Sequence, residues 1–583
     1  MEATVRLSLA LLALLLAQQV QILPAPQQPP RDVRPRSEPT GTGVIRGKVV
    51  AADTGMPIRR AALNLSYATP TAPVAQQPVA DRVIRPRQST TDAQGGFEFT
   101  NLPAGSYRIF ASPGQYSAQY LGGQYGAKRP GDLGKPIELA AGQVVDKVVI
   151  ALARGAVIAG RVTDDTGEPI ARVQVYGLWF SPGSSRGQRN NPGMQTDDLG
   201  QFRLYALQPG EYVVIAEARS NTFVPPNAIL DREEDPTGLM TTYYPGTADE
   251  ATAQRVRAAS GRETAGIEIR MVQGRLYRLA GTVMDSQGRP AARVNGSIMQ
   301  RGLSGFPNFG GGFSTDEQGR FQMRNIAPGT YRLMIRPRTD VVDGVPKTDG
   351  AESANIPLTI SADVENLMIV TTPGVTITGQ VVFEQGPPSP LPTQMRVTTM
   401  SAEPGMDFGM NPQPAVVQPD MTFTIKGMTG EYLLRAGAPN AYLKAVMLGS
   451  DDITDTPREF KPQDRVTIVL TSRASTLEGT VTDAKGAPTD SAIIMFSEDK
   501  AGWRPNSSRT RRNASDGSGH FRITGLMPGR YYILAAPRER LNMPPNVDAS
   551  FFEELVKDAT TILIGEDEQR TVDLKVIPTP GGD

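Results

Sequence analysis

The chain has 583 residues, more than the about 250–300 residues over which a single hydrophobic core grows, so we expect several domains. Its 60 basic residues balance its 60 acidic residues, which excludes the basic surface that nucleic-acid-binding proteins need. With no cysteine and one histidine, the chain cannot form disulfides, thiolate nucleophiles or zinc sites built on several imidazoles. Its 59 glycines and 49 prolines indicate many turns and therefore many short strands.

The N-terminal segment has the composition of a targeting signal. Arg6 precedes an apolar run over residues 7–17, which is shorter than the roughly 20 residues of a membrane span. We therefore predict a signal peptide within residues 1–25, cleaved after about residue 17 to 25, and a disordered Pro-rich linker over residues 26–42. Since no later run is long and apolar enough to span a bilayer, we expect a secreted or periplasmic protein with no stable membrane insertion after cleavage.

The rest of the chain repeats one phrase five times. Each copy opens with an apolar strand that carries a G-x-V core, with its glycine at Gly47, Gly160, Gly281, Gly379 and Gly479. Four copies continue with a turn that contains Asp, Gly and Pro, over Asp53–Pro57, Asp165–Pro169, Asp285–Pro290 and Asp483–Pro488. In such turns the Asp carboxylate accepts a backbone hydrogen bond from two residues on, and Gly supplies a positive φ.

The second half of each copy is a D-x-x-G turn, an alternating strand, an apolar-Pro-Gly turn and a strand that carries a tyrosine. The turns begin at Asp92, Asp198, Asp316 and Asp516, and the tyrosines are Tyr107, Tyr212, Tyr331 and Tyr531. The fourth copy is degenerate: it keeps Phe423 and Tyr432 but has lost the D-x-x-G turn.

About seven short strands in about 105 residues per copy predict a sandwich of two antiparallel sheets. We therefore predict an all-β protein of five tandem seven-stranded sandwich modules with almost no helix. The expected modules cover residues 43–153, 154–273, 274–371, 372–471 and 472–578. Because each module has to close its own sheet edges, we expect the modules to follow one another in a row, joined by short linkers.

Taken together, these phrases resemble the bacterial carboxypeptidase regulatory-like domain. The resemblance rests on G-x-V-x-D-x-x-G-x-P, D-x-x-G-x-F and L-x-P-G-x-Y, which recur in this order through nearly all of the chain after the linker. It implies a transthyretin-like (prealbumin-like, carbohydrate-binding-like) Greek-key β-sandwich. It also implies a non-catalytic module with a broad role in adhesion or ligand display, since nothing in this chain resembles the catalytic part of a carboxypeptidase.

The residues of the chain provide no catalytic or metal site. His520 is the one imidazole that a serine-type triad could use, and it occupies a slot where other copies carry Gly96, Gln201 and Arg320. We therefore expect it to face solvent at the start of a strand. Each Asp turn offers one or two carboxylates, whereas calcium needs about six to eight oxygen ligands. We predict no catalytic residues, no metal site and no cofactor.

Aromatic residues in loops are the candidate ligand contacts. They are Tyr120 and Tyr125 in the first copy, Tyr243 and Tyr244 in the second, and Trp503 in a polar loop that also carries four arginines. Tyrosine rings can stack on sugar faces, and an isolated indole can anchor a partner. The alternative, which we favour for the tyrosines, is that they cover a sheet edge or fill a junction between modules. Trp179 lies in an apolar strand and should belong to the core.

These observations favour a non-enzymatic, multi-module protein of the cell envelope that serves as a scaffold, spacer or adhesin. The expected partners are glycans or envelope proteins, and nucleic acid is excluded. A second possibility is a carbohydrate-binding protein that uses the tyrosine loops of the first two copies. A third, an accessory subunit of a peptidase or another enzyme, would require a site that these residues do not supply.

Overall fold

The computed structural model describes residues 41–67, 86–114, 117–180, 187–189, 191, 193–218, 237–301, 307–336, 340–342, 345–347, 352–387, 395–402, 412–438, 440–504, 506–538, 541 and 549–577. The predicted signal peptide, and the predicted linker up to residue 40, lie outside these residues. The described chain is almost entirely β-structure, which confirms the predicted all-β sandwich class. We refer below to five modules: module 1 (residues 43–152), module 2 (156–275), module 3 (277–373), module 4 (375–471) and module 5 (475–577).

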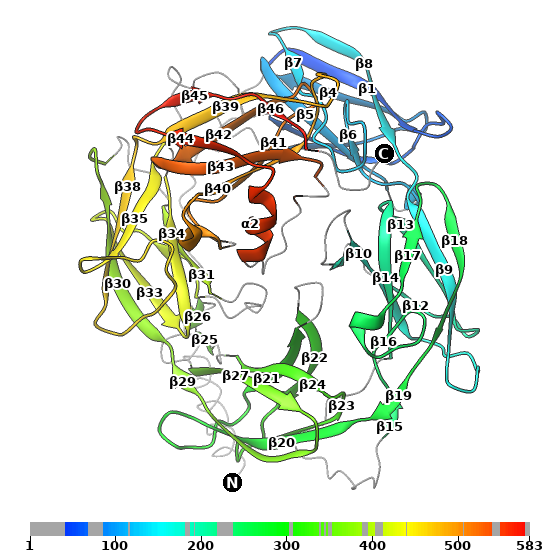
Figure 1. Cartoon of the computed structure of the whole chain (residues 1–583), viewed down its shortest axis with the longest axis vertical. Coiled ribbons are helices and arrows are strands. Elements are labelled where there is room, and N and C mark those ends of the chain that lie inside the picture. The colour runs from blue at the N-terminus through cyan, green and yellow to red at the C-terminus, as the bar shows by residue number, and fades with distance from the viewer. Residues whose placement is uncertain are drawn as a thin grey trace, which may run out of the picture.

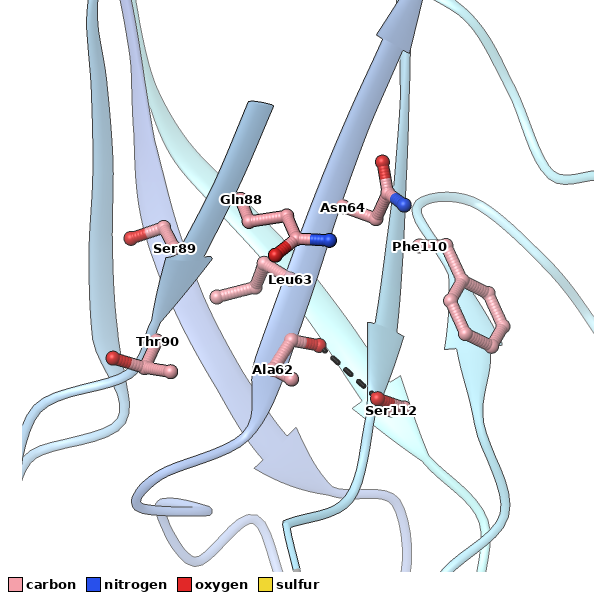
Figure 2. Close-up of a pocket in the computed structure, with 8 residues that line it drawn as sticks. All are labelled: Ala62, Leu63, Asn64, Gln88, Ser89, Thr90, Phe110 and Ser112. Carbon is pink, nitrogen blue, oxygen red and sulfur yellow. Dashed lines mark hydrogen bonds between the residues drawn. The ribbon is translucent and has the colours of Figure 1, made fainter. Parts of the chain in front are cut away.

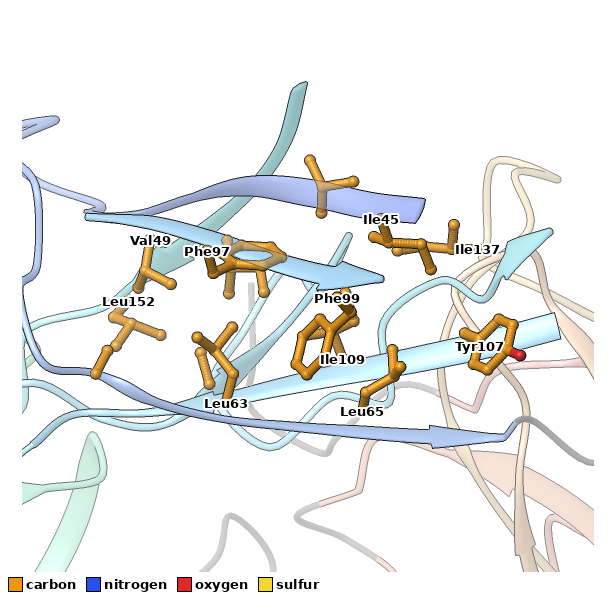
Figure 3. Close-up of a cluster of buried hydrophobic side chains, with 14 of the residues drawn as sticks. Ile45, Val49, Leu63, Leu65, Phe97, Phe99, Tyr107, Ile109, Ile137 and Leu152 are labelled. Atoms are coloured by element: carbon orange, nitrogen blue, oxygen red, sulfur yellow. The ribbon is translucent and has the colours of Figure 1, made fainter. Parts of the chain in front are cut away.

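Module 1 shows the common plan of two facing sheets. The first sheet has the order β4 (Gly96–Leu102), β1 (Gly43–Ala51), β8 (Val144–Leu152). The second has the order β3 (Arg87–Thr90), β2 (Ala62–Tyr67), β5 (Gly105–Ser112), β6 (Gly123–Gln124), and β7 (Ile137–Leu139) also pairs with β5. Alternate residues of both sheets, such as Ile45, Val49, Leu63 and Ile109, point inward and form one buried core (Figure 3).

Modules 2 and 3 repeat this plan. In module 2 the first sheet is β13 (Gln201–Leu207), β9 (Ala156–Thr163), β18 (Glu263–Arg270), and the second is β11 (Gly187–Arg189), β10 (Gln174–Phe180), β14 (Gly210–Glu217), β16 (Thr242–Tyr243), with β12 (Met194–Gln195) and β17 (Arg255–Ala258) at its edges. In module 3 the first sheet is β23 (Arg320–Ile326), β20 (Tyr277–Met284), β28 (Val364–Val370), and the second is β22 (Pro307–Ser314), β21 (Asn295–Arg301), β24 (Gly329–Ile335), β27 (Glu352–Ile360), β29 (Thr372–Pro373). Short pairs and turns add β15 (Thr237–Leu239) with β19 (Gln273–Arg275), β25 (Asp340–Val342) with β26 (Val345–Lys347), and the 3₁₀ turn η3 (Glu250–Thr252).

Modules 4 and 5 depart from the plan at their edges. In module 4 the first sheet is β33 (Thr422–Met428), β30 (Val375–Phe383), β38 (Arg465–Thr471), β35 (Tyr442–Leu448), β36 (Asp451–Asp452), and the second is β32 (Ala415–Val416), β31 (Arg396–Ser401), β34 (Glu431–Ala436), β37 (Arg458–Glu459). In module 5 the first sheet is β42 (His520–Leu526), β39 (Ser475–Thr482), β45 (Gln569–Thr571) and β46 (Leu574–Lys575), and the second is β41 (Arg511–Ala514), β40 (Ala492–Ser497), β43 (Gly529–Ala536), β44 (Thr560–Ile564). Module 5 also carries the 3₁₀ turn η4 (Lys500–Gly502) and the helix α2 (Ala549–Val556), which packs on the outer face of its second sheet.

The glycine of each G-x-V core is required by the strand that closes the module. That strand pairs parallel to the opening strand, as β18 does with β9, and the register shifts next to Gly160. A Cβ atom on Gly160 would lie 1.8 Å from the carbonyl oxygen of Ile267, and the equivalent glycines are equally crowded. The prediction of two antiparallel sheets is therefore wrong for the first sheet of each module, which contains one parallel pair, because strand direction depends on how the chain crosses between the sheets.

Most Asp turns form as predicted, but those of module 2 use a different residue, and the first turn of module 1 is not capped by its aspartate. Among the described residues Asp53 accepts no backbone hydrogen bond; it pairs with Arg154 (3.1 Å), and the amide of Met56 donates to Thr54 Oγ1 (3.3 Å) instead. In the D-x-x-G turn of module 1, Asp92 Oδ1 accepts hydrogen bonds from the backbone amides of Gln94 (2.9 Å) and Gly96 (2.6 Å). In module 2 the carboxylates that do this are Asp164 and Asp197, so the assignment to Asp165 and Asp198 was wrong. Where two aspartates follow one another, only the backbone path decides which one faces the turn.

The repeated tyrosine fixes the apolar-Pro-Gly turn. The hydroxyl groups of Tyr107, Tyr212, Tyr331 and Tyr531 donate to the carbonyl oxygen four residues earlier, at 2.7–2.8 Å. Burial raises the pKa of Tyr331 to about 12, so this hydroxyl remains a donor throughout the physiological range. The tyrosine therefore anchors both the core and the turn before it.

Replacing Tyr331 with phenylalanine should lower the free energy of unfolding by about 1–3 kcal/mol, because the carbonyl of Ala327 loses its partner. Chemical denaturation checks this value. The exposed Tyr205 is the control, since its change to phenylalanine should have almost no effect. Equal effects of the two changes would contradict the assigned role.

The modules are arranged in a ring. In Figure 1 they follow one another around a closed circuit, and module 5 (orange to red) lies beside module 1 (blue). The expected row of modules is therefore wrong. A backbone–backbone hydrogen bond and a bond from a backbone amide to a carboxylate join the first module directly to the last, and such a contact cannot be read from linear sequence.

Candidate functional site

The predicted tyrosines of module 1 lie at a module junction. Tyr120 is 8% exposed and belongs to the core of module 1. The guanidinium group of Arg154, in the segment that leads into module 2, lies 5.4 Å from the centre of the Tyr120 ring and donates to its hydroxyl (3.3 Å). Arg154 also pairs with Asp53 (3.1 Å). Tyr125 is half-buried against the core of module 1.

The aromatic residues of modules 2 and 5 are also largely covered. Tyr243 is 9% exposed within a buried cluster, and Tyr244 is half-buried against the core of module 2. Trp503 is 5% exposed, donates from Nε1 to the carbonyl of Ser497 (2.8 Å) and packs against both Phe496 and Phe552. Trp179 lies in the core, as predicted.

These positions favour a structural role for the aromatic residues. Tyr120 fills a junction, and Tyr243 pairs at the edge of the second sheet of module 2. As ligand contacts, all five residues stay a prediction, in which only the half-buried Tyr125 and Tyr244 offer appreciable surface. His520 is exposed at the start of β42, as predicted.

Module 1 and module 5 meet through the loop that joins β6 to β7. The backbone amide of Leu133 donates to Asp490 Oδ2 (2.5 Å), and the amide of Gly517 donates to the carbonyl of Gly134 (2.9 Å). Leu133 and Asp490 are 357 residues apart in the sequence. We call this contact, formed by Arg108 and residues 132–135 of module 1 with Asp490, Asp516, Gly517 and Arg538 of module 5, the closure contact.

Charged side chains hold the closure contact on both sides. Arg108 donates to the carbonyl of Leu133 (2.9 Å), and its Nη2 lies 3.8 Å from Asp516 Oδ2. Arg538 binds Asp490 Oδ1 through both Nε (3.0 Å) and Nη2 (2.7 Å). The side chain of Asp490 is only 8% exposed, and these donors offset the cost of burying its carboxylate.

Asp132 adds a like charge to the same place. Burial raises the pKa of Asp132, and the neighbouring Asp490 carboxylate raises it further. The amide of Arg129 donates to Asp132 Oδ2 (2.9 Å) and holds the loop that carries the closure contact. Asp132 and Asp490 place two like charges in one interface, and the guanidinium group of Arg538 against Asp490 offsets their repulsion.

Modules 4 and 5 are joined by a second buried polar cluster, centred on Asp455. Its carboxylate accepts from Arg435 Nη2 (2.8 Å) and from the backbone amide and hydroxyl of Ser508 (2.7 and 2.8 Å). Arg435 also donates to the carbonyl of Asn506 (2.5 Å) across the junction. Burial lowers the pKa of Arg435, and the Asp455 carboxylate opposes that shift. We call this group the Asp455 junction.

The outer face of the second sheet of module 1 carries a shallow hollow of about 470 Å³ (Figure 2). It is lined by residues of β2, β3 and β5, namely Ala62, Leu63, Asn64, Gln88, Ser89, Thr90, Phe110 and Ser112. None of these residues is charged. The sequence analysis missed this surface, because its residues come from three strands and carry no motif.

Among the residues that the structure describes, no group of three His, Cys, Asp or Glu side chains could hold a metal ion. No helix in the same part of the chain is long and apolar enough to cross a membrane. The contacts described above join neighbouring modules through buried polar groups.

Comparison with solved structures finds distant likenesses, among them the following three. A streptococcal ancillary pilin is 14% identical, with a TM-score of 0.16 over 52% of this chain and 98% of that chain. The full-length major pilin of Streptococcus pneumoniae is 10% identical, with a TM-score of 0.14 over 93% of this chain and 100% of that chain. A protein described as a putative carbohydrate binding protein from Pseudomonas aeruginosa is 24% identical, with a TM-score of 0.13 over 19% of this chain and 90% of that chain. Likenesses of this size carry no information about what this chain binds.

No curated protein matches the chain. The model of the carboxypeptidase regulatory-like domain matches residues 157–226. The match begins in β9, the strand with the G-x-V core, and runs through the D-x-x-G turn and the tyrosine strand β14, so it covers the motifs on which the resemblance rests. Over residues 157–226, the second module is therefore similar to the carboxypeptidase regulatory-like domain.

Proposed function

We propose that this protein is an exported, non-enzymatic scaffold of the cell envelope, whose sandwich modules are held in a closed ring and display their surfaces to glycans or envelope proteins. The observation that carries the proposal is the closure contact between modules 1 and 5. A chain that served only as a flexible spacer would gain nothing from hydrogen bonds and an ion pair between its first and last modules.

The junctions along the chain support the same proposal. Arg154, between modules 1 and 2, donates to Tyr120 and Asp53 of module 1, and its carbonyl oxygen accepts from Ser260 of module 2 (2.8 Å). Between modules 3 and 4, Ser353 donates to Thr429 (3.3 Å). Because these junctions and the two between modules 4, 5 and 1 have their own contacts, we expect the modules to keep fixed positions relative to one another.

The amino-terminal segment supports export. Its short apolar run after Arg6 has the form of a secretory signal, and a chain without cysteine needs no disulfides to remain stable outside the cytoplasm. Fractionation of cells that express the full chain should place a shortened protein outside the cytoplasm. Recovery of the uncleaved chain in the cytoplasm would contradict export.

Small-angle X-ray scattering tests the scaffold. A nine-residue strand is about 30 Å long at about 3.3 Å per residue, so five modules in a row would extend about 150 Å. A closed ring should give a clearly smaller maximum dimension and one rigid profile at all dilutions. A maximum dimension near the extended value, or a scattering profile that requires a broad ensemble of conformations, would contradict the scaffold and show that the chain is a flexible spacer.

A further inference from the structure

The hollow on module 1 is built from two rows of side chains that cross three strands. Strand register places Gln88 and Phe110 on either side of Asn64, and Thr90 and Ser112 on either side of Ala62. The small Ala62 side chain lies on the strand between those that carry Thr90 and Ser112 (Figure 2). The first row presents two amides and an aromatic ring, and the second presents two hydroxyl groups around a methyl group.

These groups are available to a ligand. Asn64, Gln88 and Thr90 are exposed, and Phe110 is 42% exposed. The side-chain amides of Asn64 and Gln88 make no hydrogen bond to the residues that the structure describes. Ser112 donates only a long bond (3.4 Å) to the carbonyl of Ala62. The face therefore holds unused donors and acceptors next to one aromatic ring.

The same face has a different character in modules 2 and 5. In module 2 it carries buried Tyr176, Leu178 and Ile215. In module 5 it carries Ile494 and Phe496, which are fully buried in a cluster that also contains Phe552 of α2. The repeat thus uses this face as a packing surface elsewhere. In module 1 an apolar cover would leave the side-chain amides of Asn64 and Gln88 without hydrogen-bond partners, which would cost free energy.

We propose that this face of module 1 binds a neutral oligosaccharide. An amide pair matches adjacent sugar hydroxyls as donor and acceptor, and the Phe110 ring matches the apolar face of a sugar ring. Because the lining has no charge, it offers nothing to a phosphate or a nucleic acid. Three strands about 4.8 Å apart place Gln88 and Phe110 about 10 Å from each other, which gives an extended site.

This proposal moves carbohydrate recognition from the tyrosine loops to a sheet face. It is independent of ring closure, because all of its residues belong to β2, β3 and β5 of module 1. The two proposals therefore fail separately: scattering reports on the ring, and sugar titration reports on the hollow.

The test is titration of the purified full chain with cellohexaose, maltohexaose and chitohexaose, followed by isothermal calorimetry. We expect saturable binding of at least one of these neutral hexasaccharides. Phe110→Ala should weaken it at least about tenfold, and Asn64→Ala combined with Gln88→Ala should do the same. The matched control is Tyr205→Ala, which removes an exposed aromatic ring from module 2 and should leave the affinity unchanged.

Melting curves of the variants show whether a loss of binding comes from the site or from unfolding. Phe110, Asn64 and Gln88 are surface groups, so both variants should melt with the wild-type protein. The proposal is overturned if the wild-type chain binds none of the hexasaccharides, or if binding survives in both variants. The proposal would also be overturned if Tyr125→Phe and Tyr244→Phe abolished binding while the Phe110 and Asn64/Gln88 variants kept it. The tyrosine loops would then be the binding site.

Discussion

Replacing Asp490 with alanine should open the ring. The change removes the acceptor of the Leu133 amide and both hydrogen bonds from Arg538. Arg538 and Asp490 both belong to module 5, so the bond that the change takes from the contact itself is the one from the Leu133 amide, and a hydrogen bond to a charged group contributes about 1.5–3 kcal/mol. At about 1.4 kcal/mol for each factor of ten, closure should become at least about tenfold less favourable. Small-angle scattering should then show a larger maximum dimension, while the modules themselves stay folded.

Glu553→Ala is the control for this change. Glu553 also pairs with a cation of module 5, Lys500, but both side chains are more than half exposed (56% and 71%), and such pairs contribute about 0–1 kcal/mol. Its scattering profile should match that of the wild-type chain. If Asp490→Ala and Glu553→Ala gave the same profile, Asp490 would not hold the ring closed.

Replacing Asp455 with alanine should uncouple modules 4 and 5. Arg435 and Asp455 are 17% and 18% exposed, so the single change leaves a largely buried guanidinium group without its carboxylate. Breaking a buried pair in this way costs about 3–5 kcal/mol. Differential scanning calorimetry should show modules 4 and 5 melting earlier and as separate transitions, because the hydroxyl and amide of Ser508 also lose their acceptor.

A double change separates the charge from the contact. Arg435→Met with Asp455→Ala removes both buried charges and keeps much of the side-chain volume, so it should be less destabilising than Asp455→Ala alone. Glu431→Ala, an exposed position on the same strand as Arg435, should leave the transitions unchanged. A double variant that melts as early as the single one would show that the buried charge is not the cause.

The local rules of this fold could be predicted from its repeats. The G-x-V glycine, the D-x-x-G turn and the turn tyrosine each meet a requirement of the backbone within one module. Each therefore recurs at a fixed spacing in the sequence. The glycine of D-x-x-G illustrates this. Gly95 has a φ of 73°, and a Cβ atom there would lie 2.6 Å from the carbonyl oxygen of Val49, so no other residue fits without strain.

Helix α2 was missed for a different reason. It is eight residues long, and it carries the buried Phe552 and Leu555 on one face, three positions apart. That spacing was visible in the sequence, but a single short helix among many strands gives a weak signal. Its presence also explains Trp503, whose polar loop suggested an exposed anchor and whose ring instead packs against Phe552.

The contacts between modules could not be predicted. Asp490 and Arg538 are ordinary polar residues in their own module, and their role arises only when the loop at Leu133 reaches them from the other end of the chain. The hollow on module 1 depends in the same way on strand register, which places Gln88, Asn64 and Phe110 in one row. Such juxtapositions leave no periodic or spaced signal in one sequence.

A disulfide across the closure contact tests the ring most directly. The chain has no cysteine, and a Cβ atom on Gly517 would lie 2.8 Å from Cγ of Lys135, so Lys135→Cys with Gly517→Cys should cross-link under mild oxidation. Lys135→Cys with Gln287→Cys, which places the second thiol on an exposed turn of module 3, is the control pair and should stay reduced. The ring predicts a monomer with an intrachain disulfide, independent of protein concentration. Failure to cross-link, or interchain products alone, would contradict it.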